Sequence, residues 1–379
     1  MKEKESILQD RAFIELNFSN LAHNIEEIKK VIDKDCKIMA VVKANAYGHG
    51  IVQIAKMLNR IGVKDFAVAT LSEGILLRKH HIDGNILILG YTDVSNIEYV
   101  IEYDLMQTII DYEYAKKIET IELKSKLKVH VKINTGMNRI GENYENMEKL
   151  QEIYQMKNIE ILGTYTHLCV ADSFEEEDGV FTKIQIDRFN QCIEQLKRQK
   201  CDVGKVHVQS SYGVLNYPYL KYDFVRVGIV MYGVYSNYHE NTVVKLNLRP
   251  VLSLKARITS VKEIKKGEAV SYGRTFVADE SKKIATVSIG YADGYPRNLS
   301  GQNVEVLVNG KYAKIIGRIC MDQLIIDVSN VSGIKQGDLV TFIGDKDEIS
   351  AEKIASASNT ITNELLSRLG NRIERISKE

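Results

Sequence analysis

The amino-acid sequence predicts a (β/α)8 barrel of the TIM type followed by a mostly β C-terminal domain. From about residue 13 to 233, short runs of β-branched residues alternate with longer amphipathic segments, the pattern of strand–helix units around a parallel sheet. There are eight such runs, the number of strands in this barrel. After Pro250, short alternating strands separated by turns replace this pattern. An open, doubly wound sheet is the alternative, because periodicity alone does not prove that a sheet closes.

The elements are expected in a regular order along the chain. Helices are predicted between the barrel strands; in 181–199, for example, Phe189 and Leu196 belong to an apolar series at helical spacing. In the second domain, Asn309 and Gly310 indicate a tight hairpin, and the amphipathic segment 349–367 is expected to be helical. We place the barrel at residues 10–240 and the β domain at 241–379. The eight strands are expected at 37–43, 66–69, 86–89, 107–110, 128–133, 160–166, 205–209 and 224–229.

Charge and hydropathy exclude several classes of protein. The 379 residues include 51 Lys and Arg against 50 Asp and Glu, so the chain lacks the basic surface that binds nucleic acid or anionic lipid. Small neutral or zwitterionic partners are favoured. No apolar run approaches the ~20 residues of a membrane span, and the polar start has no signal-peptide core. The five cysteines form no CxxC pair, which favours reduced thiols in the cytoplasm, with no disulfide framework and no metal site.

The segment VVKANAYGHG, residues 41–50, is the most informative part of the chain. Lys43 closes a buried strand, and a glycine-bearing loop then leads into a helix. In a barrel this is the catalytic face. Burial at the barrel mouth lowers the pKa of a lysine, which makes its amine usable for a Schiff base or a proton shuttle. A lysine that only extends from a strand end towards solvent is the alternative.

Nine motifs in the same order resemble those of the alanine racemase family, pyridoxal-phosphate enzymes of fold type III built from a barrel and a β domain. The resemblance covers nearly the whole chain. It implies pyridoxal 5'-phosphate as the cofactor and Lys43 as the lysine that carries it. The motifs are IELNFSNLAHNI at 14–25, VVKANAYGHG at 41–50, VKINTGMNRIG at 131–141, YTHL at 165–168, VRVGIVMYG at 225–233, VSYGRTF at 270–276, IGYADGYPR at 289–297, IGRICMDQ at 316–323 and NELLSRL at 363–369.

The resemblance also implies the other cofactor-binding residues. Arg226 would face the pyridine nitrogen, and since an arginine keeps its proton, that nitrogen would stay unprotonated and the cofactor would be a weaker electron sink. Gly228 and Ile229 follow Arg226 at the last strand, where the final loops of a barrel bind phosphate. Tyr47 and Ser211 resemble the family's phosphate ligands.

Two acid–base groups are needed to invert a Cα atom, because a proton leaves one face and returns on the other. Lys43 is one of them, and Tyr272 in VSYGRTF resembles the second. A free tyrosine has a pKa near ~10, so Tyr272 needs cationic neighbours to act at neutral pH. His167 of YTHL, expected beside Arg226, is the family's candidate for that network.

Lys132 and Arg139 in VKINTGMNRIG match the family at both positions. In the family this lysine is often carbamylated and holds the arginine, which steadies the phenolic oxygen of the cofactor and contributes to the substrate side. The motif departs at Asn134 and Asn138, where the family commonly has Asp and often Gly. The hydrogen bonding of this loop is therefore expected to differ.

Part of the site is predicted to come from a second subunit. Tyr291, Met321 and Asp322 resemble the residues on the substrate-carboxylate side, and they share the β domain with Tyr272. In the family arrangement this domain reaches the barrel of its partner in a head-to-tail homodimer. The oligomer would then be part of the active site.

Asn363 is the most important departure from ordinary alanine racemases, which carry a tyrosine at this position beside the phosphate and the substrate methyl group. An asparagine is smaller and offers an amide, which leaves room and a partner for a hydroxymethyl group. This resembles the membrane-bound serine racemases of vancomycin-resistance operons. The prediction is therefore racemisation of L- and D-serine, and also of alanine, for modified peptidoglycan precursors. The polar start at 1–10 would suit a soluble domain tethered through a preceding membrane segment.

Three alternatives remain. The first is an ordinary alanine racemase that has drifted at Asn363. The second, a barrel decarboxylase, would need an acidic residue where Arg226 stands, and the chain has no GGG phosphate loop. The third is a non-catalytic pyridoxal-phosphate carrier, which would lack the tyrosine-bearing motif VSYGRTF.

Overall fold

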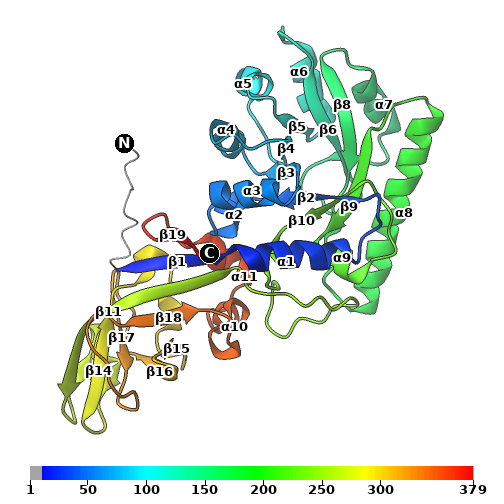
Figure 1. Cartoon of the computed structure of the whole chain (residues 1–379). Coiled ribbons are helices and arrows are strands. Elements are labelled where there is room, and N and C mark those ends of the chain that lie inside the picture. The colour runs from blue at the N-terminus through cyan, green and yellow to red at the C-terminus, as the bar shows by residue number, and fades with distance from the viewer. Residues whose placement is uncertain (1–10, 379) are drawn as a thin grey trace.

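A computed structural model describes residues 11–378 and contains the predicted closed barrel (Figure 1). Eight parallel strands form one sheet in the order β5-β4-β3-β2-β10-β9-β8-β6, and pairing of β5 with β6 closes it. This excludes the open sheet. The eight runs that the sequence predicts correspond to β2 (Lys37–Val41), β3 (Asp65–Val68), β4 (Asn85–Ile88), β5 (Met106–Ile109), β6 (Leu127–Asn134), β8 (Ile159–Tyr165), β9 (Lys205–Ser210) and β10 (Phe224–Val227), and the short β7 (Glu142–Asn143) pairs beside β6.

The longer helices cover the outside of the barrel. A large apolar cluster fills the layer between strands and helices, and a smaller one that includes Met39, Leu87 and Phe224 packs separately from it. The predicted helix at 181–199 is α8, which begins five residues earlier. The helices are α1 (Phe18–Lys29), α2 (Lys43–Tyr47), α3 (Ile51–Arg60), α4 (Leu71–Lys79), α5 (Ile97–Glu102), α6 (Tyr112–Glu119), α7 (Met147–Gln155), α8 (Glu176–Arg198) and α9 (Ser211–Asn216).

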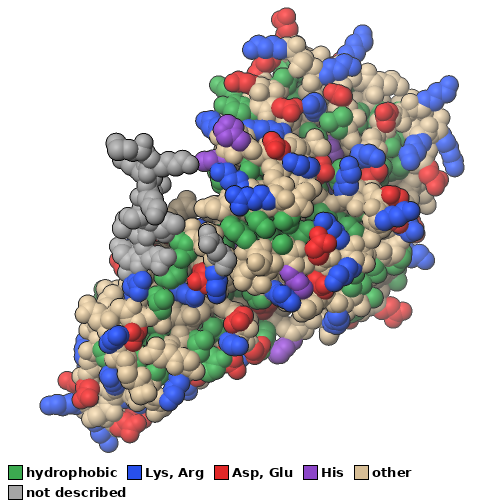
Figure 2. Space-filling model, in the orientation of Figure 1, with side chains coloured by type: hydrophobic (Ala, Val, Ile, Leu, Met, Phe, Trp, Pro, Cys, Tyr) green, Lys and Arg blue, Asp and Glu red, His purple; other side chains and the backbone are tan. Residues whose placement is uncertain are grey.

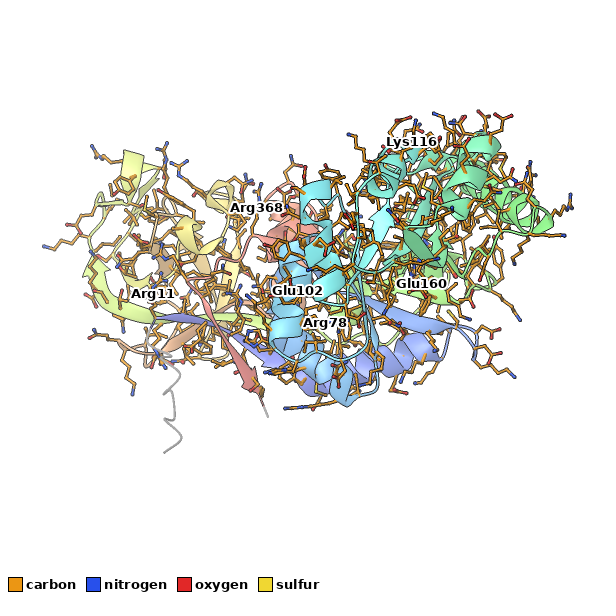
Figure 3. All side chains as sticks on the ribbon, turned by 90° about the horizontal axis from the view of Figure 1, so that it is seen from above. Arg11, Arg78, Glu102, Lys116, Glu160 and Arg368 are labelled. Atoms are coloured by element: carbon orange, nitrogen blue, oxygen red, sulfur yellow. The ribbon has the colours of Figure 1, made fainter. Side chains whose placement is uncertain are left out.

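The second domain is an eight-stranded, mostly antiparallel sheet beside the barrel (Figures 1 and 3). The predicted hairpin is present: Asn309 and Gly310, both at positive φ, join β15 to β16. Backbone geometry of this kind suits the twist of a two-residue hairpin. The strands of this sheet are β1 (Ala12–Asn17), β11 (Leu252–Ile264), β14 (Lys282–Val287), β15 (Glu305–Val308), β16 (Lys311–Ile316), β17 (Leu324–Asp327), β18 (Leu339–Ile343) and β19 (Glu374–Lys378), and the short β12 (Ala269–Val270) and β13 (Phe276–Val277) pair separately.

The first described strand, β1 (Ala12–Asn17), belongs to this second sheet. It lies inside the range predicted for the barrel, but it pairs with β11 and β19. Its apolar side chains, such as Ile14 and Leu16, are fully buried there. The chain therefore begins its described course in the β domain and enters the barrel through α1. The predicted boundary at residue 10, like the polar start, lies outside the described residues.

The C-terminal helical segment is divided in two and connects the domains. Within the predicted 349–367, α10 (Ala351–Ala357) and α11 (Thr362–Ser367) are separated by a turn in which Asn359 has a positive φ. Helix α11 packs against α2, and the Thr362 amide donates to the carbonyl of Ser236 at 2.8 Å. These contacts bring Asn363 to the mouth of the barrel.

The surface mixes both signs of charge, and the face in Figure 2 shows no extended patch of one sign. Within residues 11–378, no helix is both long and apolar enough to cross a membrane. The same part of the chain holds no group of His, Cys, Asp and Glu side chains arranged to bind a metal ion, and its five cysteines are unpaired. The predicted cytoplasmic location stays a prediction.

Candidate active site

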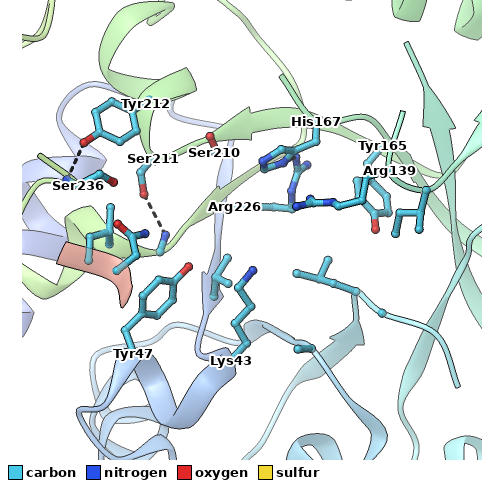
Figure 4. A pocket seen from close by; sticks show the side chains of 18 of the residues that line it. Lys43, Tyr47, Arg139, Tyr165, His167, Ser210, Ser211, Tyr212, Arg226 and Ser236 are labelled. Carbon is cyan, nitrogen blue, oxygen red and sulfur yellow. Dashed lines mark hydrogen bonds between the residues drawn. The ribbon is translucent and has the colours of Figure 1, made fainter. Parts of the chain in front are cut away.

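A cavity of about 510 Å³ opens at the carboxyl ends of the barrel strands (Figure 4). This is the face on which loops after the strands build catalytic sites in such barrels. Ten of the residues predicted from the sequence line it together: Lys43, Tyr47, Lys132, Arg139, His167, Ser211, Arg226, Gly228, Ile229 and Asn363. They come from strands spread around the barrel and from α11, so only the closed fold unites them.

Lys43 stands two residues after the end of β2, and its side chain points into the cavity (Figure 4). Burial lowers the pKa of Lys43, and the nearby Arg139 cation lowers it further. The backbone that follows is a left-handed turn in which Ala44, Asn45, Ala46 and Tyr47 all have φ between 52° and 54°. Each such non-glycine residue costs about 1–2 kcal/mol relative to a right-handed conformation. Packing and hydrogen bonds must hold this turn in place.

Tyr47, Ser211 and Gly228 meet at one end of the cavity. The Gly228 amide donates to Ser211 Oγ at 3.1 Å. A Cβ atom on Gly228 would lie 2.7 Å from Tyr47 Oη, so glycine is required for the phenol to approach the backbone. Burial raises the pKa of Tyr47 to about 12, which leaves a neutral phenol that can donate a hydrogen bond. Hydroxyl and amide donors of this kind suit an anionic phosphate.

Arg226 is buried under the opposite end of the cavity. Its Nη2 donates to the carbonyls of Thr166 and Val208 at 2.7 and 2.8 Å, and its Nη1 contacts His207 Nδ1 at 2.7 Å. Burial lowers the pKa of Arg226 to about 10, so the guanidinium still carries its proton at neutral pH. The guanidinium also lies over the ring of Tyr165.

His167 lies beside Arg226, as predicted, with Nδ1 3.1 Å from Arg226 Nη2. Burial, together with the Arg226 cation, holds the pKa of His167 well below its usual range. Lys132 is also buried, with its amine over the ring of Tyr165. Burial and then the charges of Arg226 and Arg139 lower the pKa of Lys132 strongly, so a neutral amine is favoured there.

Asn134 and Asn138, the two departures from the family motif, hydrogen-bond to each other and to the loop backbone. Asn134 Oδ1 accepts from the amides of Gly136 and Asn138, and Asn134 Nδ2 donates to Asn138 Oδ1 at 2.8 Å. Asn138 adopts a positive φ of 56°, a conformation that asparagine tolerates better than most residues. The loop is thus closed by asparagine amides, and Arg139 follows it at the cavity wall.

Four predicted residues do not reach the cavity of their own chain. Tyr272, Tyr291 and Met321 lie on the second domain with 71%, 39% and 53% of their surfaces exposed, and Asp322 pairs with Arg372 at 2.7 Å. The two loops that carry Tyr291 and Met321 are joined by backbone hydrogen bonds, including Ala292 N to the Met321 carbonyl. Three large side chains of the second domain are therefore exposed to solvent, and the loops that carry two of them are joined to each other.

Several lining residues were not singled out from the sequence. Tyr165 stacks on His207, and Tyr212 Oη accepts from the Ser236 amide at 2.7 Å beside the cavity. Tyr165 lies inside the motif YTHL and could have been found there. Tyr212 directly follows Ser211, whereas Ser236 carries no motif and is brought in by the loop after β10. The remaining additional lining residues are Val41, Ala69, Leu89, Gly90, Ile140 and Ser210.

A lysine at a strand end, neutral donors at one end of the cavity and a buried arginine at the other are typical of barrel proteins that bind pyridoxal phosphate. Two family models match the chain: the alanine racemase N-terminal domain over residues 16–236 and the alanine racemase C-terminal domain over residues 251–377. The chain belongs to the alanine racemase family, whose members depend on pyridoxal phosphate.

Individual relatives agree with this assignment. An amino-acid racemase from Enterococcus faecalis is 41% identical to this chain, and the match covers all of this chain and 53% of that protein. A serine/alanine racemase from Enterococcus gallinarum is 38% identical, and the match covers 98% of this chain and 52% of that protein. The chain therefore spans about half the length of these relatives. An alanine racemase from Carboxydothermus hydrogenoformans is 42% identical, over 96% of this chain and 98% of that protein. The solved alanine racemase of Clostridium difficile 630 matches with a TM-score of 0.92 at 35% identity, covering 98% and 97% of the two chains.

Proposed function

We propose that the protein is a pyridoxal-phosphate-dependent amino-acid racemase that interconverts L- and D-serine and also accepts alanine. The family assignment supports the reaction class. The observation that carries the choice of serine is Asn363: its residue lines the cavity, and its buried Oδ1 has no hydrogen-bond partner within residues 11–378. An unpaired acceptor of this kind calls for a donor from a ligand.

The residues present fit the cofactor. Gly228 leaves the space in which Tyr47 Oη meets the backbone, and Ser211 supplies a hydroxyl at the same place. These groups would hold the phosphate, Lys43 would bind the aldehyde carbon, and Arg226 would donate to the pyridine nitrogen. When bound, the cofactor supplies the electron-withdrawing ring that acidifies the α-proton of the amino acid.

Lys43 and Tyr272 are proposed to move the α-proton. The lowered pKa of Lys43 favours an amine that can accept a proton at neutral pH. Tyr272 would take the proton of the L-isomer, while Lys43 returns one to the opposite face; the reverse reaction exchanges these roles. Arg226 and His167 would supply the hydrogen-bonding environment for Tyr272, since both are at the cavity and one carries a positive charge.

A head-to-tail homodimer is proposed to complete the site. The cavity of one chain contains Lys43 but lacks Tyr272, Tyr291, Met321 and Asp322, which its own second domain presents elsewhere. A second copy that places its β domain over the barrel mouth would supply the missing groups. Tyr291, Met321 and Asp322 would then form the substrate-carboxylate side together with Arg139.

Carbamylation of Lys132 is proposed as well. A neutral amine reacts with carbon dioxide by forming an N–C bond and releasing its proton to water, which converts the side chain into an anion. That anion would lie near Arg139 and Arg226, the two cations that lower the pKa of Lys132. A 13C carbamate signal from protein kept under labelled carbon dioxide would test this; its absence, with Lys132 unmodified, would contradict it.

The serine preference connects the chain to a cellular role. One relative is called a serine/alanine racemase, and another, matched over the whole of this chain, is called an amino-acid racemase. D-serine made here would supply modified peptidoglycan precursors of the kind used in vancomycin resistance. Other relatives are called alanine racemases, so cell-wall D-alanine is the second candidate function.

The deciding experiment compares both substrates in one assay. The purified full chain, loaded with pyridoxal phosphate, is given L-serine or L-alanine, and the D-isomers are measured by chiral chromatography. We expect racemisation of both, with the larger kcat/KM for serine. Racemisation of alanine alone would restore the alanine-racemase alternative, and formation of neither D-isomer by a cofactor-loaded protein would refute the proposal.

A further inference from the structure

The left-handed turn after β2 needs an external brace because its residues are not glycines. Ala44, Asn45 and Ala46 have φ and ψ values near 50°, a conformation that L-residues other than glycine adopt as single residues rather than as runs. The turn begins at Lys43 and ends at Tyr47, two residues that line the cavity. Any relaxation of the turn would move both side chains.

The end of the turn away from Lys43 is held by hydrogen bonds to nearby residues. His49 Nδ1 lies 3.0 Å from the carbonyls of both Ala46 and Tyr47, and Asn45 Oδ1 accepts from the Ile51 amide. These bonds act on the side away from the reacting amine. At the end where Lys43 stands, the Val42 amide donates to the Ala67 carbonyl at 2.9 Å and the Val42 carbonyl accepts from the Ala46 amide at 2.8 Å.

Glu73 of α4 adds side-chain hydrogen bonds at that end. Its Oε1 accepts from the Ala44 amide at 2.7 Å, and its Oε2 accepts from the Ala69 amide, also at 2.7 Å. Glu73 is the third residue of a helix capped by Thr70, where a glutamate ordinarily bonds back to the cap residue's own amide. Here the carboxylate links two strand-end loops instead.

The charge of Glu73 also acts on the amine. Arg139 and Arg226 are the cations that act on Lys43, and they favour its neutral form. Glu73 is the anion that opposes them. One carboxylate therefore fixes the backbone at Lys43 and offsets part of the positive field around its side chain.

We propose that Glu73 is a positioning residue for Lys43: its carboxylate ties the left-handed turn to the loop after β3 and so holds the amine in the cavity. The inference rests on the proposed function only in taking Lys43 as the reacting amine. Its test uses the full chain without cofactor, so that loss of racemase activity and failure of this inference remain separate results.

Two measurements on Glu73→Gln test the proposal. A glutamine can accept only one of the two backbone bonds without turning its own NH2 group towards an amide. Hydrogen exchange over residues 42–50 should therefore rise roughly tenfold or more, as expected for loss of a hydrogen bond to a charged group. The pH dependence of Lys43 acylation, followed by peptide mass spectrometry, should show an acid dissociation constant roughly threefold to tenfold larger, because the opposing charge is gone.

Matched variants separate positioning from general destabilisation. Glu102→Gln removes an exposed carboxylate from the neighbouring α5 and should change neither measurement (Figure 3). Ala44→Gly, placed in Glu73→Gln, should restore part of the exchange protection, because glycine adopts a positive φ at little cost. Glu73→Asp keeps the charge and should leave the Lys43 profile near that of the unmodified chain. If Glu73→Gln changes neither measurement, or changes exchange without altering Lys43 acylation, the proposal is wrong.

Discussion

Replacement of Asn363 by tyrosine should lower the preference for serine by about tenfold. Asn363 reaches the cavity from α11, and its Oδ1 is buried without a partner within residues 11–378. A serine hydroxyl would satisfy this acceptor, whereas an alanine methyl group would leave it unpaired. Asn363→Tyr removes the acceptor and fills space that a hydroxymethyl group needs.

The expected magnitude follows from that one interaction. A neutral hydrogen bond contributes about 0.5–1.5 kcal/mol net, which corresponds to a change of roughly two- to thirteenfold in a rate ratio. Steric exclusion by the larger side chain acts in the same direction. A site that bonds a substrate hydroxyl discriminates more strongly than one that is merely apolar, so kcat/KM for serine should fall much more than that for alanine.

The assay measures kcat/KM for both amino acids with the same enzyme preparation. Ser367 lies on the same helix, and within residues 11–378 its hydroxyl donates only to the Glu364 carbonyl. Ser367→Ala therefore serves as the matched control. The control should leave the serine-to-alanine ratio unchanged. An unchanged ratio in Asn363→Tyr would refute the role of Asn363 and favour an ordinary alanine racemase.

Three further predictions concern the barrel and the β domain. Lys43→Ala should abolish both the visible absorbance of bound cofactor and racemisation; a borohydride-reducible adduct at another lysine would exclude the assignment. Tyr272→Phe should suppress α-proton exchange from the L-substrate far more than solvent exchange in the D-isomer, and equal losses would indicate a structural role. Burial lowers the pKa of His130 to about 3. Between pH ~6.5 and 3 the unfolded chain therefore binds a proton at this histidine that the folded chain does not bind. The free energy of unfolding should fall as the pH drops through this range, by up to about 1.4 kcal/mol per pH unit for this group. Chemical denaturation of His130→Asn should show a weaker dependence in this range, and an unchanged slope would contradict the reasoning.

The sequence predicts the parts of the fold that local patterns determine. The eight short β-branched runs correspond to the eight barrel strands, and the Asn309 and Gly310 pair forms the predicted hairpin turn. The position of β1 could not be predicted in this way, since its partners lie more than two hundred residues away in β11 and β19. Long-range pairing of this kind leaves no periodic signal near the strand itself.

In the candidate site, too, some residues could be predicted from the sequence and others could not. Motif residues such as Lys43 and Arg226 were identifiable because several motifs in order define a family, and the structure brings them to one cavity. The left-handed turn that begins at Ala44 contains no glycine, so the sequence gives no signal for its positive φ values. Glu73 looks in sequence like an ordinary first-turn helix residue, and only the closed barrel shows that it meets the Ala44 amide.

Subunit complementation tests the central claim most directly, since that claim divides the racemase site between Lys43 of one chain and Tyr272 of another. Lys43→Ala and Tyr272→Phe proteins, each with little activity, are mixed in equal amounts under conditions of proven subunit exchange. Random pairing gives half mixed dimers with one intact site in two, so about a quarter of the normal serine racemisation should return. No recovery despite subunit exchange would show that the site is built within a single chain.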